Sequence, residues 1–483
     1  MDILQTLYFV VPELILAIGA MVLLVLGVYM GEESGRTISF ASIALLIAAM
    51  LVVAVYATDE PVLLFGGAFR IDAFASFCKL IIFAGAAFAI LMSDKFLGGE
   101  ELGRFEYPIL IVLAALGMAM MVSANDLIAL YMGVETQSLA LYILASFNRD
   151  SRRSTEAGLK YFVLGALSSC LLLYGASLIY GFTGATQFDA IAEISKTSTN
   201  ANVGLVVGLV FLISGLAFKV SAAPFHMWTP DVYEGAPTPV TAFFAAAPKL
   251  AGMALFVRAL MGPFPDIVDQ WQPIIAILSV ASMAVGAVSA IAQTNIKRLM
   301  AYSSIGHMGF ALIGLAAGTE TGVQSVLTYM TIYVAMTIGT FACILLMRRR
   351  GGMTEQISDL AGLSRTNPGF AIVLTVLFFS LAGVPPTAGF LAKFFVFSAA
   401  VDAGMVWLAV AGAIASVIAA FYYLRVIWIM WFDEPAPVFE AEAGARLGIT
   451  SMLSAALMFP LLLVFINPLS NAAGKAAAAL FQT

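Results

Sequence analysis

The sequence has few charged residues. Lys, Arg, Asp and Glu make up 11% of its 483 residues, whereas a soluble domain has about 25%. Hydrophobic residues make up 61%, against about 45–50% in a soluble domain. So many apolar side chains cannot all be buried in a water-soluble fold, and the composition therefore predicts a membrane protein. It excludes a soluble enzyme, a nucleic-acid binder and a disordered chain.

The sequence also has few residues that hold cofactors. Its three cysteines, Cys78, Cys170 and Cys343, lie far apart in apolar stretches, so they predict neither a disulfide framework nor an iron–sulfur or metal site. It lacks GxxxxGKS/T, a GxGxxG motif after a strand and HExxH, which bind phosphate, dinucleotides and zinc. The first apolar run has no basic region before it, so we expect no removable signal peptide. We expect no cofactor and no metal in this chain.

Apolar runs separated by polar residues, Gly or Pro predict an all-α polytopic membrane protein with about fourteen transmembrane helices. Two of the runs, 203–234 and 369–400, are too long for one straight crossing, and they contain Pro224 and the pair Pro385 and Pro386. Proline removes a backbone donor and clashes with the preceding turn, so both runs are predicted to be broken helices. The fourteen runs lie near 8–30, 38–57, 72–93, 107–123, 126–147, 158–181, 203–234, 238–261, 272–292, 299–317, 323–347, 369–400, 404–431 and 446–467.

Two groups of five runs have similar spacing. The first group starts near 107 and the second near 272, and corresponding starts differ by a nearly constant offset of about 166 residues. This spacing predicts a duplicated five-helix unit with one broken helix in each copy. Because five is odd, the copies should be inverted relative to each other, as in many transporters. We expect helices 1–3 in 1–106, the two repeats in 107–261 and 262–431, and a last helix with a tail in 432–483.

Basic residues are distributed unevenly between the two ends of the predicted bundle. Basic loops stay on the cytoplasmic side of a membrane, so the richer end is predicted to be cytoplasmic and both termini to face outward. The richer end has Arg36, Lys95, Arg104, Arg149, Arg152, Arg153, Lys297, Arg298, Arg348, Arg349, Arg350, Arg365 and Arg446, and the poorer end has Arg70, Lys196, Arg258 and Lys475.

Four ionisable residues lie deep inside the predicted spans: Glu135, Lys219, Lys249 and Lys393. Charges at this depth are costly and indicate function by default. A buried lysine loses its proton easily, whereas a nearby carboxylate helps it to keep that proton. The set could therefore pass protons from one residue to the next. The alternative is that Glu135 and Lys219 form a fixed structural ion pair.

Further polar residues are weaker relay candidates. Lys160 is either a relay site or a side chain that reaches to the membrane surface. His226, beside the break at Pro224, either relays protons or satisfies freed backbone groups. Lys297 is either a basic anchor or the mouth of a proton path, and Tyr302 in the same segment is also a candidate.

Four more residues have simpler interpretations. Asp126 is predicted to cap the helix that follows it, and His307 is expected to be a hydrogen-bonded packing residue. Lys79 and Arg425 are charges inside spans for which the sequence suggests no partner.

Several of these residues lie in segments that resemble a known family. The segments 130–135 (LYMGVE), 218–226 (FKVSAAPFH), 248–250 (PKL) and 295–304 (NIKRLMAYSS) resemble the proton-translocating, antiporter-like membrane subunits of respiratory complex I. The resemblance covers essentially the whole chain. Within that group, 383–394 (GVPPTAGFLAKF) is most similar to the N subunits of NADH-quinone oxidoreductase, which have a lysine at the position of Lys393.

The resemblance implies a role for each deep charge. Glu135 and Lys219 would form the input pair, Lys249 would connect two half-channels, and Lys393 would lead to the outer face. Quinone reduction would supply the energy in other subunits, which would hold FMN, iron–sulfur clusters and quinone. The partners would be other complex I subunits, above all neighbouring antiporter-like ones, in a bacterial inner membrane.

Two alternatives stay open at this point. The first is a subunit of a multi-subunit sodium/proton antiporter of the Mrp type, which shares the fold and most of the motifs. The second is a free-standing solute carrier with a substrate pocket at the helix breaks.

Overall fold

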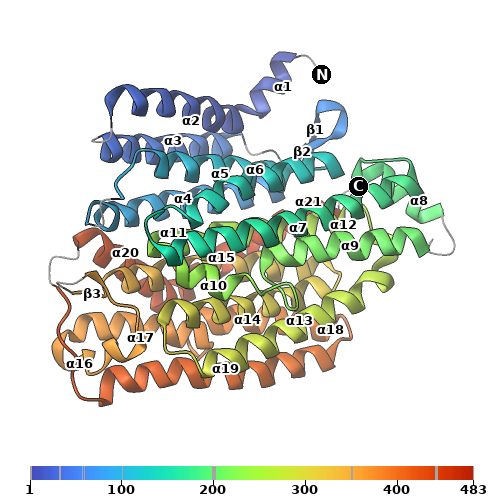
Figure 1. Cartoon of the computed structure of the whole chain (residues 1–483). Coiled ribbons are helices and arrows are strands. Elements are labelled where there is room, and N and C mark those ends of the chain that lie inside the picture. The colour runs from blue at the N-terminus through green and yellow to red at the C-terminus, as the bar shows by residue number, and fades with distance from the viewer. Residues whose placement is uncertain are drawn as a thin grey trace.

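The predicted all-α membrane fold is confirmed by the computed structural model, in which long apolar helices run roughly side by side (Figure 1). The structure describes the whole chain except residues 1–2, 32–33, 57, 59, 100–101, 198–202, 350–351, 441–443 and 482–483. Within the described residues, twelve helices are long and apolar enough to cross a bilayer, or thirteen if one bent pair near the C-terminus counts as a single span. The sequence predicts about fourteen. The run 369–400 explains part of the difference, because each of its halves has only 15 residues.

The helices are joined mostly by short connections. Their bounds are α1 (Ile3–Phe9), α2 (Val11–Met30), α3 (Gly35–Val55), α4 (Ala73–Gly99), α5 (Glu106–Ser123), α6 (Leu127–Ala145), α7 (Arg152–Thr183), α8 (Phe188–Thr197), α9 (Val203–Val220), α10 (Thr229–Gly235), α11 (Thr238–Ala245), α12 (Ala247–Met261), α13 (Val268–Ile291), α14 (Ile296–Ala316), α15 (Glu320–Leu345), α16 (Leu363–Thr366), α17 (Pro368–Ala382), α18 (Ala388–Asp402), α19 (Val406–Phe432), α20 (Ala445–Ala456) and α21 (Leu462–Phe481). Two small antiparallel hairpins pair β1 (Val62–Leu64) with β2 (Phe69–Ile71) and β3 (Arg348–Arg349) with β4 (Gly352–Met353).

Both predicted breaks are present. The first lies between α9, which ends at Val220, and α10, which begins at Thr229. The second lies between α17, which ends at Ala382, and α18, which begins at Ala388. The prediction that Asp126 caps a helix is also confirmed, because its carboxylate accepts hydrogen bonds from the first backbone N–H groups of α6.

Two further breaks, which the sequence does not predict, lie within the runs 238–261 and 446–467. The first run divides at Ala246 into α11 and α12. The second bends by 92° near Phe459, and α21 is helical to Phe481 where a tail is predicted. Pro248 and Pro460 lie at these points, and each lacks the N–H group that a continuous helix needs.

The centre of the bundle consists of α11, α12, α14 and α15, whose residues are nearly all buried. By contrast, α2, α3 and α19 lie at the edges of the bundle (Figure 1), and only about a third of the residues in each of these spans are buried. Val55 and Val417 are examples of the others, since each is 75% exposed. Apolar side chains therefore cover the outside, and the buried charges lie within the bundle.

The two groups of basic residues lie at opposite ends of the bundle. The start of α20, α16 and β3 are at the left of Figure 1, whereas β1 and α8 are at the right. At the left end, Arg153 pairs with Glu234 at 2.8 Å, and Arg446 pairs with Asp94 at 2.8 Å. We call this the basic end. Arg350, which the sequence assigns to it, lies outside the described residues.

Candidate functional site

Glu135 and Lys219 belong to one hydrogen-bonded cluster that Ser169 connects. Glu135 is on α6, Ser169 is on α7, and Lys219 is the second-last residue of α9. The Ser169 hydroxyl donates to Oε1 of Glu135. Nζ of Lys219 lies 3.5 Å from Oγ of Ser169 and donates to Oγ of Ser138 at 2.9 Å. The sequence predicts that the glutamate and the lysine form a pair, and in the structure the Ser169 hydroxyl lies between them. The sequence analysis does not single out this serine.

Lys249 lies in the first turn of α12, directly beside the first break. Its Nζ donates to the carbonyl oxygen of Val220, the last residue of α9, at 3.2 Å, and to the hydroxyl of Ser221. The Trp228 ring lies 5.1 Å from the ammonium, within the range of a cation–π contact. The side chain is only 1% exposed, so these groups replace water around the charge.

Lys393 lies on α18, directly beside the second break. Its Nζ donates to the carbonyl oxygen of Ala382, the last residue of α17, at 2.7 Å and to Oγ of Ser416 at 2.8 Å. The ring of Phe310 lies 4.6 Å from the ammonium. As at Lys249, a helix carbonyl, a hydroxyl and an aromatic ring surround a buried lysine.

A common physical reason explains both placements. The last carbonyl groups of a helix have no partner within the helix, and they form the negative end of its dipole. These carbonyl oxygens therefore accept hydrogen bonds from a buried amine and offset part of the cost of burying its charge when it is protonated. Arg425, for which the sequence suggests no partner, is placed in the same way: it donates to the carbonyl oxygen of Ile291, the last residue of α13, at 2.5 Å.

His307 adjoins Lys393 through a very small cavity. The two residues line a space of about 10 Å³, which is room for about one water molecule. Nδ1 of His307 lies 2.7 Å from the Tyr329 hydroxyl, and Nε2 lies 3.3 Å from the Tyr423 hydroxyl. The expected hydrogen-bonded histidine is confirmed. Its position beside Lys393 is not predicted by the sequence.

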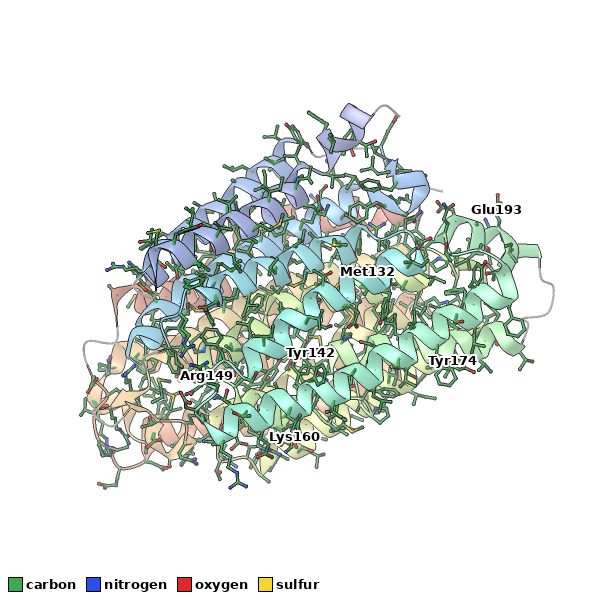
Figure 2. All side chains as sticks on the ribbon, turned by 45° about the horizontal axis from the view of Figure 1, so that its top comes forward. Met132, Tyr142, Arg149, Lys160, Tyr174 and Glu193 are labelled. Carbon is green, nitrogen blue, oxygen red and sulfur yellow. The ribbon has the colours of Figure 1, made fainter. Side chains whose placement is uncertain are left out.

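Lys160 lies away from the deep cluster, toward the basic end. Figure 2 shows Lys160 and Arg149 toward one end of the bundle and Glu193 toward the other. Nζ of Lys160 lies 2.8 Å from Oδ2 of Asp231 and 2.8 Å from Oε1 of Glu156. Its side chain is 42% exposed, so the structure places it in an ion-pair network at the surface.

Lys297 belongs to the same end but is buried. Its Nζ donates to the carbonyl oxygen of Ala236 and to Oε1 of Glu355, each at 2.8 Å. Burial raises the pKa of Glu355, but the charge of Lys297 and the hydrogen bonds from Lys297 and Asn295 lower it more, so the net pKa is below its usual value. Burial likewise raises the pKa of Asp231, and its ion pairs with Lys160 and Arg298 lower it to below the usual value.

His226 and Tyr302 are less closely connected to the lysines. His226 is half-buried within the first break, and its Nδ1 has no hydrogen-bond partner among the described residues. Its backbone carbonyl accepts a hydrogen bond from the N–H group of Thr229 at 2.9 Å. Tyr302 is half-buried on α14, one turn beyond Arg298.

Two buried ion pairs have partners that the sequence does not reveal. Lys79 pairs with Glu13 at 2.5 Å between α4 and α2. Arg258, which the sequence places at a helix end, is 1% exposed, and its Nη2 donates to both carboxylate oxygens of Asp72 at 2.7 and 2.9 Å. The first pair joins two of the first helices to each other, and the second connects the start of α4 to α12.

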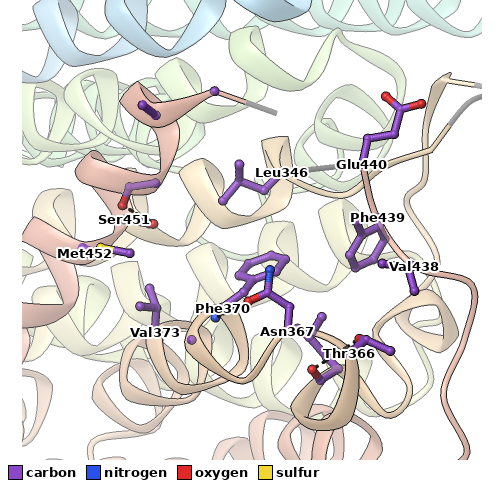
Figure 3. A pocket seen from close by; sticks show the side chains of 15 residues that line it. Leu346, Thr366, Asn367, Phe370, Val373, Val438, Phe439, Glu440, Ser451 and Met452 are labelled. Atoms are coloured by element: carbon purple, nitrogen blue, oxygen red, sulfur yellow. Dashed lines mark hydrogen bonds between the residues drawn. The ribbon is translucent and has the colours of Figure 1, made fainter. Parts of the chain in front are cut away.

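A large cavity lies away from the deep lysines. Figure 3 shows a cavity of about 450 Å³ between α16, α17 and α20, lined mainly by apolar residues with Asn367 and Glu440. None of the deep lysines lines it. Among the described residues, no three His, Cys, Asp or Glu side chains are placed to hold a metal ion.

The chain is similar to proteins of one family. Residues 124–419 match the family described as "NADH:quinone oxidoreductase/Mrp antiporter, TM". NADH-quinone oxidoreductase subunit N of Parvibaculum lavamentivorans is 58% identical over 92% of each chain. In respiratory complex I from Thermus thermophilus, one chain is 32% identical, with a TM-score of 0.77 over 92% of this chain and 96% of that one. A chain of the Mrp complex from Dietzia is 21% identical with a TM-score of 0.86, over 100% of this chain and 98% of that one, which is similarity of fold.

Proposed function

The chain belongs to the NADH:quinone oxidoreductase/Mrp antiporter family, and we propose that it moves protons through Glu135, Lys219, Lys249 and Lys393. Its curated relatives are named NADH-quinone oxidoreductase subunit N. It is accordingly a proton-translocating membrane subunit of that enzyme and works with other subunits. Quinone reduction in those subunits, which hold the redox groups, drives it in a bacterial inner membrane.

One observation carries the proposal. At each of the two breaks that the sequence predicts, a buried lysine donates to the last carbonyl of the interrupted helix: Lys249 to Val220, and Lys393 to Ala382. Interrupted helices whose ends coordinate a cation or proton at membrane depth are typical of transport proteins. A fixed structural role would not require such a lysine at both breaks.

The first step is the protonation of Lys219. A carboxylate about 5 Å from an ammonium contributes about 3 kcal/mol at an effective dielectric near 20, or about two pK units. Glu135 therefore favours the protonated lysine, and Ser169 fixes their arrangement. When that attraction weakens, the proton passes to Lys249 on the far side of the break.

The second step joins Lys249 to Lys393. The Tyr233 ring lies 5.9 Å from the Lys249 ammonium. Farther along, the Tyr333 hydroxyl donates to Ser304 at 2.9 Å. His307 and the cavity of one water then adjoin Lys393. In this proposal, the groups between the lysines exchange hydrogen bonds as the proton moves, and Lys393 releases it toward the outer face.

The remaining expectations are part of the same proposal. The basic end is cytoplasmic, because basic loops are retained there, and both termini face outward. Protons enter through the ion-pair network of Lys160 and Lys297, with His226 and Tyr302 as further relay candidates. The two inverted five-helix repeats, 107–261 and 262–431, each supply one broken helix.

The two alternatives are less well supported. A subunit of an Mrp antiporter is disfavoured because the similarity to the Dietzia complex is 21%, far below the 58% to an N subunit. A solute carrier needs a substrate pocket at the breaks. The cavity beside Lys393 has a volume of only about 10 Å³, which is too small for a solute.

The test is to measure pumping and assembly in the same membranes. Glu135→Gln and Lys219→Ala should each leave the complex assembled on a native gel but sharply lower NADH-driven proton pumping. Lys475→Ala, which removes an exposed lysine on α21, is the matched control and should pump normally. Loss of assembly with normal pumping per assembled complex would indicate a structural pair, and full pumping in both neutral variants would refute the proposal.

A further inference from the structure

A cavity at the basic end has features of an anion-binding site, and none of the proposed relay residues lines it. It has a volume of about 320 Å³ and lies where the start of α3, the end of α4 and the start of α20 meet. Arg36, Asp94 and Arg446 line it together with Leu91 and Leu447. It lies at the edge of the bundle, because α3 is one of the outer helices.

The charges around this cavity do not balance. Arg446 lies 2.8 Å and Arg36 lies 3.9 Å from the same carboxylate oxygen of Asp94. Two guanidinium groups therefore share one carboxylate, so among the described residues that line the cavity the side-chain charges sum to +1. The side chains of Arg36 and Arg446 are 70% and 41% exposed, so both can still reach a bound anion.

The two arginines are also held in position. Their guanidinium carbons lie 5.8 and 5.2 Å from the centre of one ring, that of Phe40. Such contacts orient a planar cation. A guanidinium group can donate two parallel N–H···O hydrogen bonds to one phosphate. The backbone N–H groups at the start of α20 add positive potential on the same side of the cavity.

Each arginine is followed by a row of exposed apolar side chains on its own helix. After Arg36, the row on α3 is Phe40, Ile47, Leu51 and Val55, and after Arg446, the row on α20 and its continuation is Ile449, Leu453 and Leu457. The steps of three, four or seven residues keep each row on one face of the helix. An exposed apolar face of α3 therefore leads away from Arg36, and one of α20 leads away from Arg446.

We propose that this cavity binds the phosphate of an anionic phospholipid, with one acyl chain along α3 and the other along α20. Basic pockets between helices on the cytoplasmic side are suited to such headgroups. The lipid would connect the N-terminal helices to α20 and so stabilise the chain within the assembled complex.

The experiment compares lipids on the purified, delipidated complex. Phosphatidylglycerol should raise its melting temperature and be retained in native mass spectrometry, whereas phosphatidylcholine should do neither. Inorganic phosphate at millimolar concentration should have little effect, because it lacks the acyl chains. Stabilisation by inorganic phosphate equal to that by phosphatidylglycerol would overturn the lipid assignment.

Variants locate the site. A double variant with Arg36→Gln and Arg446→Gln should retain one fewer phosphatidylglycerol molecule per complex, whereas Arg149→Gln, an exposed arginine at the same end, should not change the number. Asp94→Asn removes the competing carboxylate and should bind the lipid more tightly. Equal retention by the double variant and the wild type, or weaker retention by Asp94→Asn, would refute the proposal.

Discussion

Nζ of Lys393 lies 2.7 Å from the carbonyl oxygen of Ala382, across the break between α17 and α18. The next residue, Gly383, makes this approach possible. Its φ is +83°, and a Cβ atom there would lie 2.9 Å from Cδ of Lys393. Only glycine combines this backbone conformation with the space that the lysine side chain occupies.

Gly383→Ala should therefore impair pumping as well as stability. The left-handed backbone costs a residue with a Cβ about 1–2 kcal/mol, and the added methyl group must displace Lys393. Gly404→Ala is the matched control, because Gly404 has a φ of +77° and open space around its Cβ position. Both variants should melt at a lower temperature. Only Gly383→Ala should lower the pumping rate per assembled complex, and equal pumping by the two would contradict this.

Ser169→Ala should weaken the first relay step. It removes the hydroxyl between Glu135 and Lys219, so the protonated lysine loses part of its stabilisation, and we expect pumping to fall several-fold. Ser168→Ala is the control, since that buried serine donates to the carbonyl of Gly215 instead. NADH-driven pumping in membrane vesicles measures both variants. If both variants lost pumping to a similar extent, the effect would come from disturbed helix packing and not from the Ser169 hydrogen bonds.

Asp72→Asn should destabilise the chain strongly. It leaves Arg258, which is 1% exposed, without its counter-charge, and breaking a buried pair costs about 3–5 kcal/mol. Asp266→Asn breaks a pair with Lys196 at 4.0 Å that is about half exposed, so it should cost about 0–1 kcal/mol. The yield and melting temperature of the complex compare the two. Equal losses would mean that the Asp72–Arg258 pair contributes little.

The ion pair of Lys297 and Glu355 should give a pH-dependent contribution to stability. The pKa of Glu355 is lowered in the folded chain, so its contribution is present above the unfolded pKa of about 4.3. That contribution is lost as the pH falls through the lower, folded pKa. Glu355→Gln should therefore lower the melting temperature at pH 7, and the gap to the wild type should narrow below about pH 4. Glu60→Gln, an exposed glutamate, is the control, and a constant gap for Glu355→Gln would contradict the prediction.

The orientation of the chain can be tested at Ser151, which caps α7 at the basic end. A cysteine there should resist an impermeant thiol reagent in intact cells and react in inverted vesicles, because basic loops stay in the cytoplasm. Labelling of this cysteine in intact cells would show that the proposed orientation is wrong.

The sequence predicts most helices because an apolar run of about 20 residues is long enough to span the hydrocarbon core of a bilayer. It also predicts the breaks at Pro224 and Pro385, where long runs contain prolines. It does not predict the breaks near Pro248 and Pro460, because those prolines lie in runs short enough for a single crossing.

The partners of the buried charges could not be predicted from the sequence. Asp72 and Arg258 are 186 residues apart, and Lys79 and Glu13 lie on helices that an apolar pattern does not place side by side. Ser169 is one of many serines in apolar runs, and only the packing of α6, α7 and α9 gives it a role. The pattern shows which residues are costly to bury, whereas the tertiary fold decides what each one contacts.

In the proposed relay, the tight packing around Lys393 limits which ion can pass. A space of about 10 Å³ holds about one water molecule, whereas a metal cation needs a shell of several oxygen atoms in place of its hydration water. The ammonium group at the wall repels any such cation as well. A proton crosses by the exchange of hydrogen bonds between neighbouring groups, so no atom has to travel through the gap. If the proposed path runs through this cavity, the lack of room alone favours protons over sodium ions there, without a dedicated filter.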